Sequence, residues 1–378
     1  MIRRTKVDRK NIVNVLYVIV IIAVLFSNFF SYRLSCILLL RPDYKFHNET
    51  EIHFIDVGQG DAIAIKFDNG KTMLIDTGTE AYRKKLEYYL NNIILDKDRK
   101  IDYLVLTYKD VDHSGNMMFI LENYEIGAFY RPKIYSLSED NGSINTSSWY
   151  DKIIDYATYL NIPMIFNESG IIISEGFNKL TWLSPIDLEH NDEIDSNDFS
   201  PVIKLEYKNH SALFTGDISE DTEDVLLNKY ASTDVLDVDI LKISHHGSAG
   251  STCEEFLDAT SPDFAGVSVG ENTYGHPANK LIARILDYDK KTGSNLYSNL
   301  YTTNNNGNII FKLSWNIELN FIYEIDNYSF NSYFTYTLIV TIIILFFMLK
   351  PYIMAYKKDL RFVIQNRKFE KYLENNTK

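Results

Sequence analysis

Two long runs without a charged residue, one near each end of the chain, constrain its fold most strongly. They extend from Asn11 to Tyr32 and from Asn327 to Leu349, which makes 22 and 23 residues. A helix needs roughly 20 apolar residues to cross the core of a bilayer. The pattern therefore predicts transmembrane helices at 11–32 and 327–349, with a separate domain at 44–325. A buried core helix is the alternative for each run.

The first run has a second alternative, the apolar part of a cleavable signal peptide, because basic residues precede it. Its length and the lack of a small-x-small cleavage site favour an uncleaved anchor. Lys and Arg collect on the cytoplasmic side of membrane proteins, and both tails, 1–10 and 350–378, are basic. We therefore expect a two-pass protein of the cell membrane, embedded in the lipid bilayer, with both termini cytoplasmic and the central domain outside.

Charge distinguishes the central part of the chain from its tails. The tails carry +4 and +5, and the formal net charge is −13, so the residues between them carry −22. Such a domain repels polyanions at long range, which weighs against a basic nucleic-acid groove. The two cysteines, Cys36 and Cys253, do not make a disulfide framework or a thiolate metal site.

Alternating apolar residues predict strands in the first part of the central domain, with a hairpin turn at 68–70. The second half alternates strands with helices, which predicts two sheets with helices packed outside them. A final hairpin is predicted at 300–313, turning on Asn306-Gly307. The expected fold class is α/β, in an α+β layered form, as a single domain.

Polar clusters follow several of the predicted apolar strands. Carboxylates and imidazoles on loops held by a rigid sheet can converge on one metal ion. His53, His190 and His210 lack such neighbours in the sequence and are predicted to lie at the surface. The clusters that end predicted strands are Asp110/Asp112/His113, TGD at 215–217, SHHGS at 244–248 and YGHP at 274–277.

Taken in order, the motifs DVGQGDA, IDTG, DVDHSG, TGD, ISHHGS, YGHPA and TTNNNG resemble the metallo-β-lactamase-fold domain of ComEC-type competence proteins. The resemblance covers about residues 50–313. It implies an αββα sandwich with a metal site at the strand ends between the sheets. The many-helix channel region of that family is missing here, so the resemblance implies a free-standing, membrane-tethered relative of the hydrolase part.

The family's HxHxDH motif implies which residues face the metal. Tyr108 stands at its first position, and a phenol with a pKa near ~10 is a poor ligand at neutral pH. Asp110, the third position, is implied to bind in a second pocket that it shares with Asp217. The resemblance thus favours one zinc or manganese ion over two. The implied ligands are Asp110, Asp112, His113, Asp217 and His245, with His246 as the alternative to His245.

Four residues are candidates for catalysis. Asp112 or Asp61 could orient the attacking water as general base, and His246 and His276 could donate hydrogen bonds to developing charge. If His246 binds the metal, it exchanges roles with His245. Each candidate also has a structural reading: Asp61 as a turn residue, His276 as the start of a helix.

These observations favour a membrane-anchored, extracytoplasmic, metal-dependent hydrolase, with a phosphodiester as the expected substrate. DNA and cell-envelope polymers are both candidates, and an ester or lactam is a further one, because a fold does not choose among these chemistries. The charge weighs against DNA uptake. The alternative is a catalytically impaired module that binds a ligand or partner, with Tyr108 as a sign of a degenerate metal site. A third hypothesis is signalling through the paired membrane helices.

Overall fold

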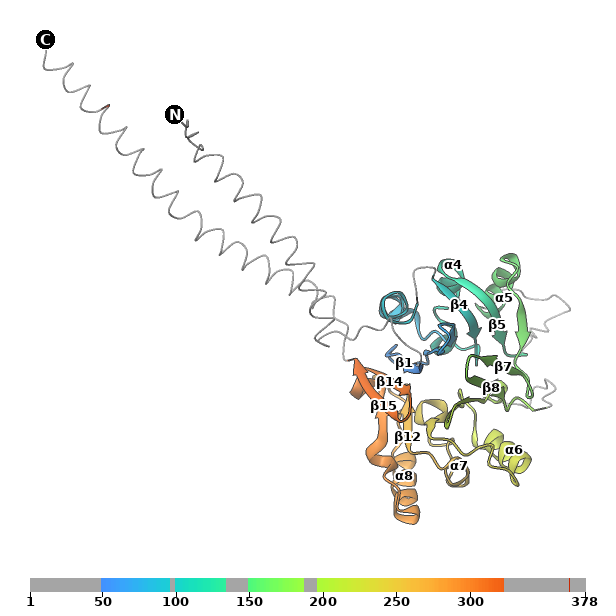
Figure 1. Ribbon diagram of the computed structural model, residues 1–378, viewed down its shortest axis with the longest axis vertical. Helices are drawn as coiled ribbons and strands as arrows, with labels where there is room; N and C mark the ends of the chain where they lie inside the picture. Colours follow the sequence, from blue (N-terminus) through green and yellow to red (C-terminus); the bar gives the residue numbers. More distant parts are fainter. Residues whose placement is uncertain (1–48, 96–98, 134–148, 187–195, 323–366, 368–378) are drawn as a thin grey trace, which may run out of the picture. The chain divides into compact units, whose positions relative to one another are not determined.

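The computed structural model describes residues 49–95, 99–133, 149–186, 196–322 and 367 (Figure 1). All of these except Arg367 belong to one of the two units into which the chain divides, Phe46–Glu324. Across the described ranges, no helix is both long and apolar enough to cross a membrane. The transmembrane helices predicted at 11–32 and 327–349 lie outside these ranges.

Two mixed sheets pack face to face at the centre of this unit (Figure 1). Within the described residues the first has eight strands in the order β15-β14-β1-β2-β3-β4-β5-β6, and the second has seven in the order β13-β12-β11-β10-β9-β8-β7. The neighbours from β3 to β6 and from β10 to β13 run parallel, and the other pairs run antiparallel.

The strand bounds follow the apolar alternation of the sequence. In the first sheet they are β1 (Thr50–Phe54), β2 (Ile63–Lys66), β3 (Thr72–Ile75), β4 (Lys100–Val105), β5 (Glu125–Arg131), β6 (Met164–Phe166), β14 (Asn308–Leu313) and β15 (Ile317–Ile322). In the second they are β7 (Ile172–Glu175), β8 (Asn178–Trp182), β9 (Ile203–Tyr207), β10 (His210–Phe214), β11 (Ile240–Lys242), β12 (Phe264–Val267) and β13 (Leu300–Thr302).

Helices cover the outer faces of both sheets, as an αββα sandwich requires (Figure 1). The longer helices are α2 (Arg83–Tyr89), α4 (Met117–Asn123), α5 (Trp149–Tyr159), α6 (Glu220–Tyr230), α7 (Glu254–Thr260) and α8 (Asn279–Thr292). The helix α8 ends where Gly293 adopts a left-handed conformation, φ 78°, which glycine does without a steric penalty. The short helix α3 (Val111–Ser114) directly follows β4.

Two apolar cores hold these layers together. The first fills the space between the sheets and contains Ile52, Phe54, Trp182, Phe214 and Phe311. The second joins the outer face of the second sheet to α6, α7 and α8. Burial of apolar surface stabilises the folded state by roughly 25 cal/mol per Å². The packed layers therefore hold the loops at the strand ends in place.

The hairpin predicted at 300–313 was wrong. Its two strands lie in different sheets: β13 pairs parallel with β12, and β14 pairs antiparallel with β1. The helix α9 (Thr303–Asn306) makes the crossing. The hairpin partner of β14 is instead β15. Local alternation gives the two strands but not their neighbours, because pairing with β12 and β1 depends on residues far away in the sequence.

The surface position predicted for His53 was also wrong. Its side chain is completely buried, and its Nδ1 lies 2.9 Å from the hydroxyl oxygen of Tyr89 on α2. Ile52 and Phe54 of the same strand enter the core between the sheets. Because strand side chains alternate, His53 faces the helix layer, where burial lowers its pKa. His190 lies outside the described residues.

Candidate metal centre

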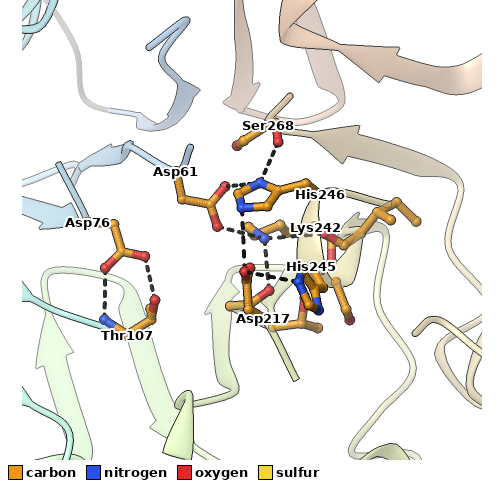
Figure 2. A network of polar contacts seen from close by, with 12 residues as sticks. Asp61, Asp76, Thr107, Asp217, Lys242, His245, His246 and Ser268 are labelled. Atoms are coloured by element: carbon orange, nitrogen blue, oxygen red, sulfur yellow. Dashed lines mark hydrogen bonds and ion pairs between the residues drawn. The ribbon is translucent and has the colours of Figure 1, made fainter. Parts of the chain in front are cut away.

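The candidate site lies where parallel strands of both sheets end. Asp112 and His113 lie on α3 just after β4, Asp217 follows β10, and His246 follows β11. Figure 2 shows Asp217 and His246 pointing toward one another from separate loops. The motifs are far apart in the sequence, but the carboxyl ends of parallel strands meet at one edge of a sheet, which brings them together.

Four side chains form the centre of this site, which we call the first cluster: Asp112, His113, Asp217 and His246. One ligand atom from each lies within 4.8 Å of all the others. Nε2 of His113 is 3.1 Å from Oδ2 of Asp217. Nε2 of His246 is 3.4 Å from Oδ2 of Asp217 and 3.4 Å from Oδ2 of Asp112. Two imidazoles and two carboxylates thus converge on one point.

Neighbouring groups fix the orientation of the His113 ring. Its Nδ1 lies 2.8 Å from Oδ2 of Asp76, and Thr107 donates its backbone N–H to the other oxygen of Asp76 at 2.8 Å. An accepting carboxylate places a proton on Nδ1 of His113 and directs Nε2 toward Asp217. This is the outer-shell arrangement typical of histidine metal ligands.

The His246 ring is oriented in the same way by a backbone group. Its Nδ1 donates to the carbonyl oxygen of Ser268 at 2.8 Å, which leaves Nε2 to face the carboxylates. Both His245 and His246 adopt left-handed backbone conformations, with φ values of 47° and 52°. Such conformations are strained for residues other than glycine and persist where surrounding structure enforces them, often at functional sites.

The proton affinities in the first cluster reflect its buried charges. Burial disfavours the charged imidazole, but the carboxylates of Asp217 and Asp76 outweigh burial and raise the pKa of His113 well above its usual value. For Asp217, burial opposes ionisation, but the imidazoles of His246 and His113 outweigh it and hold its pKa well below the usual range. The pKa of His246 is raised as well, because Asp217 and Asp112 outweigh burial.

The first cluster fits a divalent metal ion. Nε2 of His246 and Oδ1 of Asp217 are buried without a hydrogen-bond partner among the described residues. Such buried orphan atoms are costly, and a metal ion would satisfy them. A set of two imidazoles and two carboxylates suits zinc or manganese. Metal binding would displace the proton from Nε2 of each ring, because ligands bind in deprotonated form.

Comparison with known proteins agrees with this geometry. The family model of the metallo-beta-lactamase superfamily matches residues 55–270, which is more than half of the chain. The chain belongs to the metallo-β-lactamase superfamily. The matched range contains every residue of the first cluster. A buried His/Asp cluster in this fold is consistent with a metal-dependent hydrolase.

Within the superfamily, the chain is related to competence proteins. It is 29% identical over 250 residues to ComE operon protein 3 of Bacillus subtilis, covering 62% of this chain and 30% of that protein. It is 27% identical over 248 residues to competence protein ComA of Neisseria gonorrhoeae, and the match covers 65% of this chain and 31% of that protein. The chain thus matches about a third of the length of these relatives. The solved metallo-beta-lactamase fold protein YhfI from Bacillus subtilis shows 11% identity and a TM-score of 0.43, covering 70% of this chain and all of that protein.

Of the two adjacent histidines, the structure brings His246 into the first cluster and leaves His245 outside it. His246 is 2% exposed and contributes to the first cluster, as the alternative assignment had it. The His245 side chain is 33% exposed, and its Nε2 lies 3.9 Å from Oδ2 of Asp217. The rings of His245 and His276 are 5.9 Å apart, and that of the exposed Tyr274 is 5.9 Å from His276. These three rings lead from the neighbourhood of Asp217 to the exposed Tyr274.

The other predicted ligand, Asp110, lies outside both groups of described residues that could hold a metal ion. It is exposed and occupies the N-cap position of α3. Asp112 lies two residues further on, inside the helix, so its side chain reaches the first cluster while that of Asp110 does not. Tyr108 is buried and packs edge-on against His113, with ring centroids 5.9 Å apart. This edge of the site therefore presents a phenol ring where the superfamily motif has a histidine.

Asp61 lies on another side of the cluster, in contact with a residue that sequence reasoning missed. Its side chain is 1% exposed, and its Oδ2 is 2.8 Å from Nζ of Lys242 at the end of β11. Asp61 also approaches Nδ1 of His246 at 3.8 Å (Figure 2). It lies 4.0 Å from Nδ1 of His113. A lysine between Leu241 and Ile243, in an otherwise apolar strand, was the signal that could have revealed Lys242.

Proposed function

We propose that this protein is a membrane-anchored, extracytoplasmic hydrolase that uses one divalent metal ion, zinc or manganese, to cleave a phosphodiester. The observation that carries the proposal is the first cluster, where two imidazoles and two carboxylates converge and where Nε2 of His246 and Oδ1 of Asp217 are buried without a hydrogen-bond partner among the described residues. The relation to competence proteins supports DNA as the substrate, and a cell-envelope polymer is the other candidate. The acidic charge of the central residues repels a long polyanion, which favours a short phosphodiester substrate.

A metal ion bound in the first cluster would supply a water of lowered pKa and neutralise charge that develops on the phosphoryl oxygens. The chain's own residues do the rest. Asp112 is the base that accepts the proton of the attacking water, because its side chain is 34% exposed while that of Asp217 is 4% exposed. Burial opposes its ionisation, but the neighbouring imidazoles of His246 and His113 outweigh burial and lower the pKa of Asp112.

His245, which lies beside Asp217, and the neighbouring His276 bind the substrate's oxygens. His276 is neutral at physiological pH, because burial and the neighbouring His245 lower its pKa. A neutral imidazole donates one hydrogen bond, and Asn272 holds its loop by accepting from the backbone N–H of His276 at 3.0 Å. His245 projects from the strained turn that also carries His246. Donors fixed in this way stabilise developing negative charge without reorganisation.

The enzyme hypothesis is tested on the purified full-length chain. After chelation, Mn²⁺ or Zn²⁺ should restore cleavage of bis-p-nitrophenyl phosphate, and single-stranded DNA and a lactam are compared alongside it. Asp112→Asn should lower kcat by roughly 10²- to 10⁴-fold, as loss of a general base does. The matched control is Asp234→Asn, an exposed aspartate outside both ligand groups, which should retain full activity.

The competing hypothesis is a binding module that has lost its metal. A chain that takes up no zinc or manganese under any loading, and cleaves none of the three substrates, favours that module. Membrane anchoring has its own test in intact cells. External protease should cut within 49–322 and spare both tails, and alkaline extraction should leave the protein in the membrane. Release of the protein by alkaline extraction contradicts the anchor.

A further inference from the structure

A second group of ligands, which we call the second cluster, adjoins the first. It consists of Asp61, Asp76 and His113, whose ligand atoms lie within 4.8 Å of one another, and all three are buried. His113 belongs to both clusters. His113 faces the first cluster with Nε2 and the second with Nδ1, so an ion in the second cluster would be held by Asp61, Asp76 and Nδ1 of His113 after that nitrogen loses its proton.

The second cluster already has a cation of its own. Nζ of Lys242 lies 2.8 Å from Oδ2 of Asp61, and it donates to the carbonyl oxygens of Gly216 at 2.9 Å and Ile243 at 3.3 Å. Three oxygens thus surround one ammonium group on a side chain that is 2% exposed. Figure 2 shows Lys242 between Asp61 and Asp217.

The backbone holds this pair in place. The backbone N–H of Asp61 donates to the carbonyl oxygen of Asp112 at 3.0 Å, and the carbonyl oxygen of Asp61 accepts from Gly78 at 2.8 Å. The carbonyl oxygen of Lys242 accepts from the hydroxyl of Thr215 at 2.8 Å. The backbones of both residues are therefore fixed, and the carbonyl oxygens of Gly216 and Ile243 hold the ammonium beside Asp61. A second divalent cation beside it would meet like-charge repulsion in a buried, poorly screened place.

We propose that Lys242 is a positioning residue that supplies the cation of the second cluster and thereby limits the protein to one divalent ion, held by the first cluster. Its ammonium neutralises Asp61, which would otherwise be a buried carboxylate available to a metal. The inference rests on the proposed function only in that the first cluster binds an ion. It concerns how many ions the chain holds, so its readout is metal content and not activity.

The experiment measures bound Mn²⁺ per full-length chain after equilibrium dialysis, with the folded state checked by circular dichroism. The wild type should hold one ion, and Lys242→Met and Lys242→Gln should each hold two. The double variant Asp61→Asn/Lys242→Met should return to one, because the carboxylate that would take the second ion is gone. Lys204→Met is the matched control and should hold one ion: Lys204 is a largely buried lysine that donates to the carbonyl oxygens of Val235 and Asp237, away from the site.

Each outcome decides the matter. Folded Lys242→Met and Lys242→Gln proteins that hold a single ion overturn the inference. If both variants unfold without metal, Mn²⁺ should restore their structure with two ions per chain, and failure to do so also overturns it. A wild type with two ions contradicts the role of Lys242 but leaves the hydrolase intact. A wild type with no ion contradicts both proposals.

Discussion

Replacing His246 by alanine tests the assignment on which the metal centre depends. His246 Nε2 is one of four ligand atoms in the first cluster. Zinc bound by four protein ligands is worth roughly 10–16 kcal/mol at neutral pH, or roughly 2.5–4 kcal/mol for each ligand. His246→Ala should therefore weaken metal binding by about two to three orders of magnitude. It also removes the hydrogen bond to Ser268, worth about 1 kcal/mol of stability.

The adjacent His245 offers a control with nearly the same backbone. Both residues are left-handed, with φ values of 47° and 52°, so alanine meets similar strain at either position. His245 lies outside both groups of described residues that could hold a metal ion, so His245→Ala should lower metal affinity far less than His246→Ala. Calorimetric titration of the full-length chain with Mn²⁺ and Zn²⁺ measures both variants. Equal losses, or a larger loss for His245→Ala, would refute the assignment.

Three further predictions concern the groups around the cluster. Asp76→Asn should weaken metal affinity by about 10- to 100-fold, because Asp76 orients His113; an unchanged titration would contradict that role. For the chelated protein, the raised pKa of His113 adds stability that is complete below about pH 6.5 and lost as pH rises through its folded pKa; thermal unfolding from pH 6 to 9 should show this decline, and a rising melting temperature would contradict it. Burial raises the pKa of Glu223 from 4.5 to about 7, so the free energy of unfolding should fall by roughly 3 kcal/mol between pH 4.5 and 7. In urea titrations, Glu223→Gln should remove most of this dependence of stability on pH. The same pH dependence in Glu223→Gln and in the wild type would contradict the role of Glu223.

Much of the fold could be predicted because its signals are local. The helix predicted near 219–230 is α6, and the strand predicted at 201–207 contains β9. Apolar alternation identifies such strands since each one buries a face. Pairing is different. The sequence 300–313 reads as one hairpin, yet β13 and β14 belong to separate sheets because their partners, β12 and β1, are distant in the sequence.

The candidate site also has one part that the sequence predicts and one part that it does not. Motif order placed Asp112, His113 and Asp217 at strand ends, and the structure brings their ligand atoms together. Sequence spacing alone could not choose between His245 and His246. The left-handed backbone conformations of both histidines set the directions of their side chains. The carbonyl oxygen of Ser268, in the loop after β12, then accepts a hydrogen bond from His246 and fixes its ring.

By itself, then, the sequence determined the layered fold class of this domain, its superfamily and the segments that contain the candidate ligands. Apolar periodicity and the order of the motifs can be read directly from the sequence. Only the tertiary structure decided that Asp110 lies outside the ligand groups and that Lys242 meets Asp61 across 181 positions of sequence. The physical reason is that ligation and ion pairing depend on distances of a few ångströms between side chains, and those distances are set by the packing of two sheets.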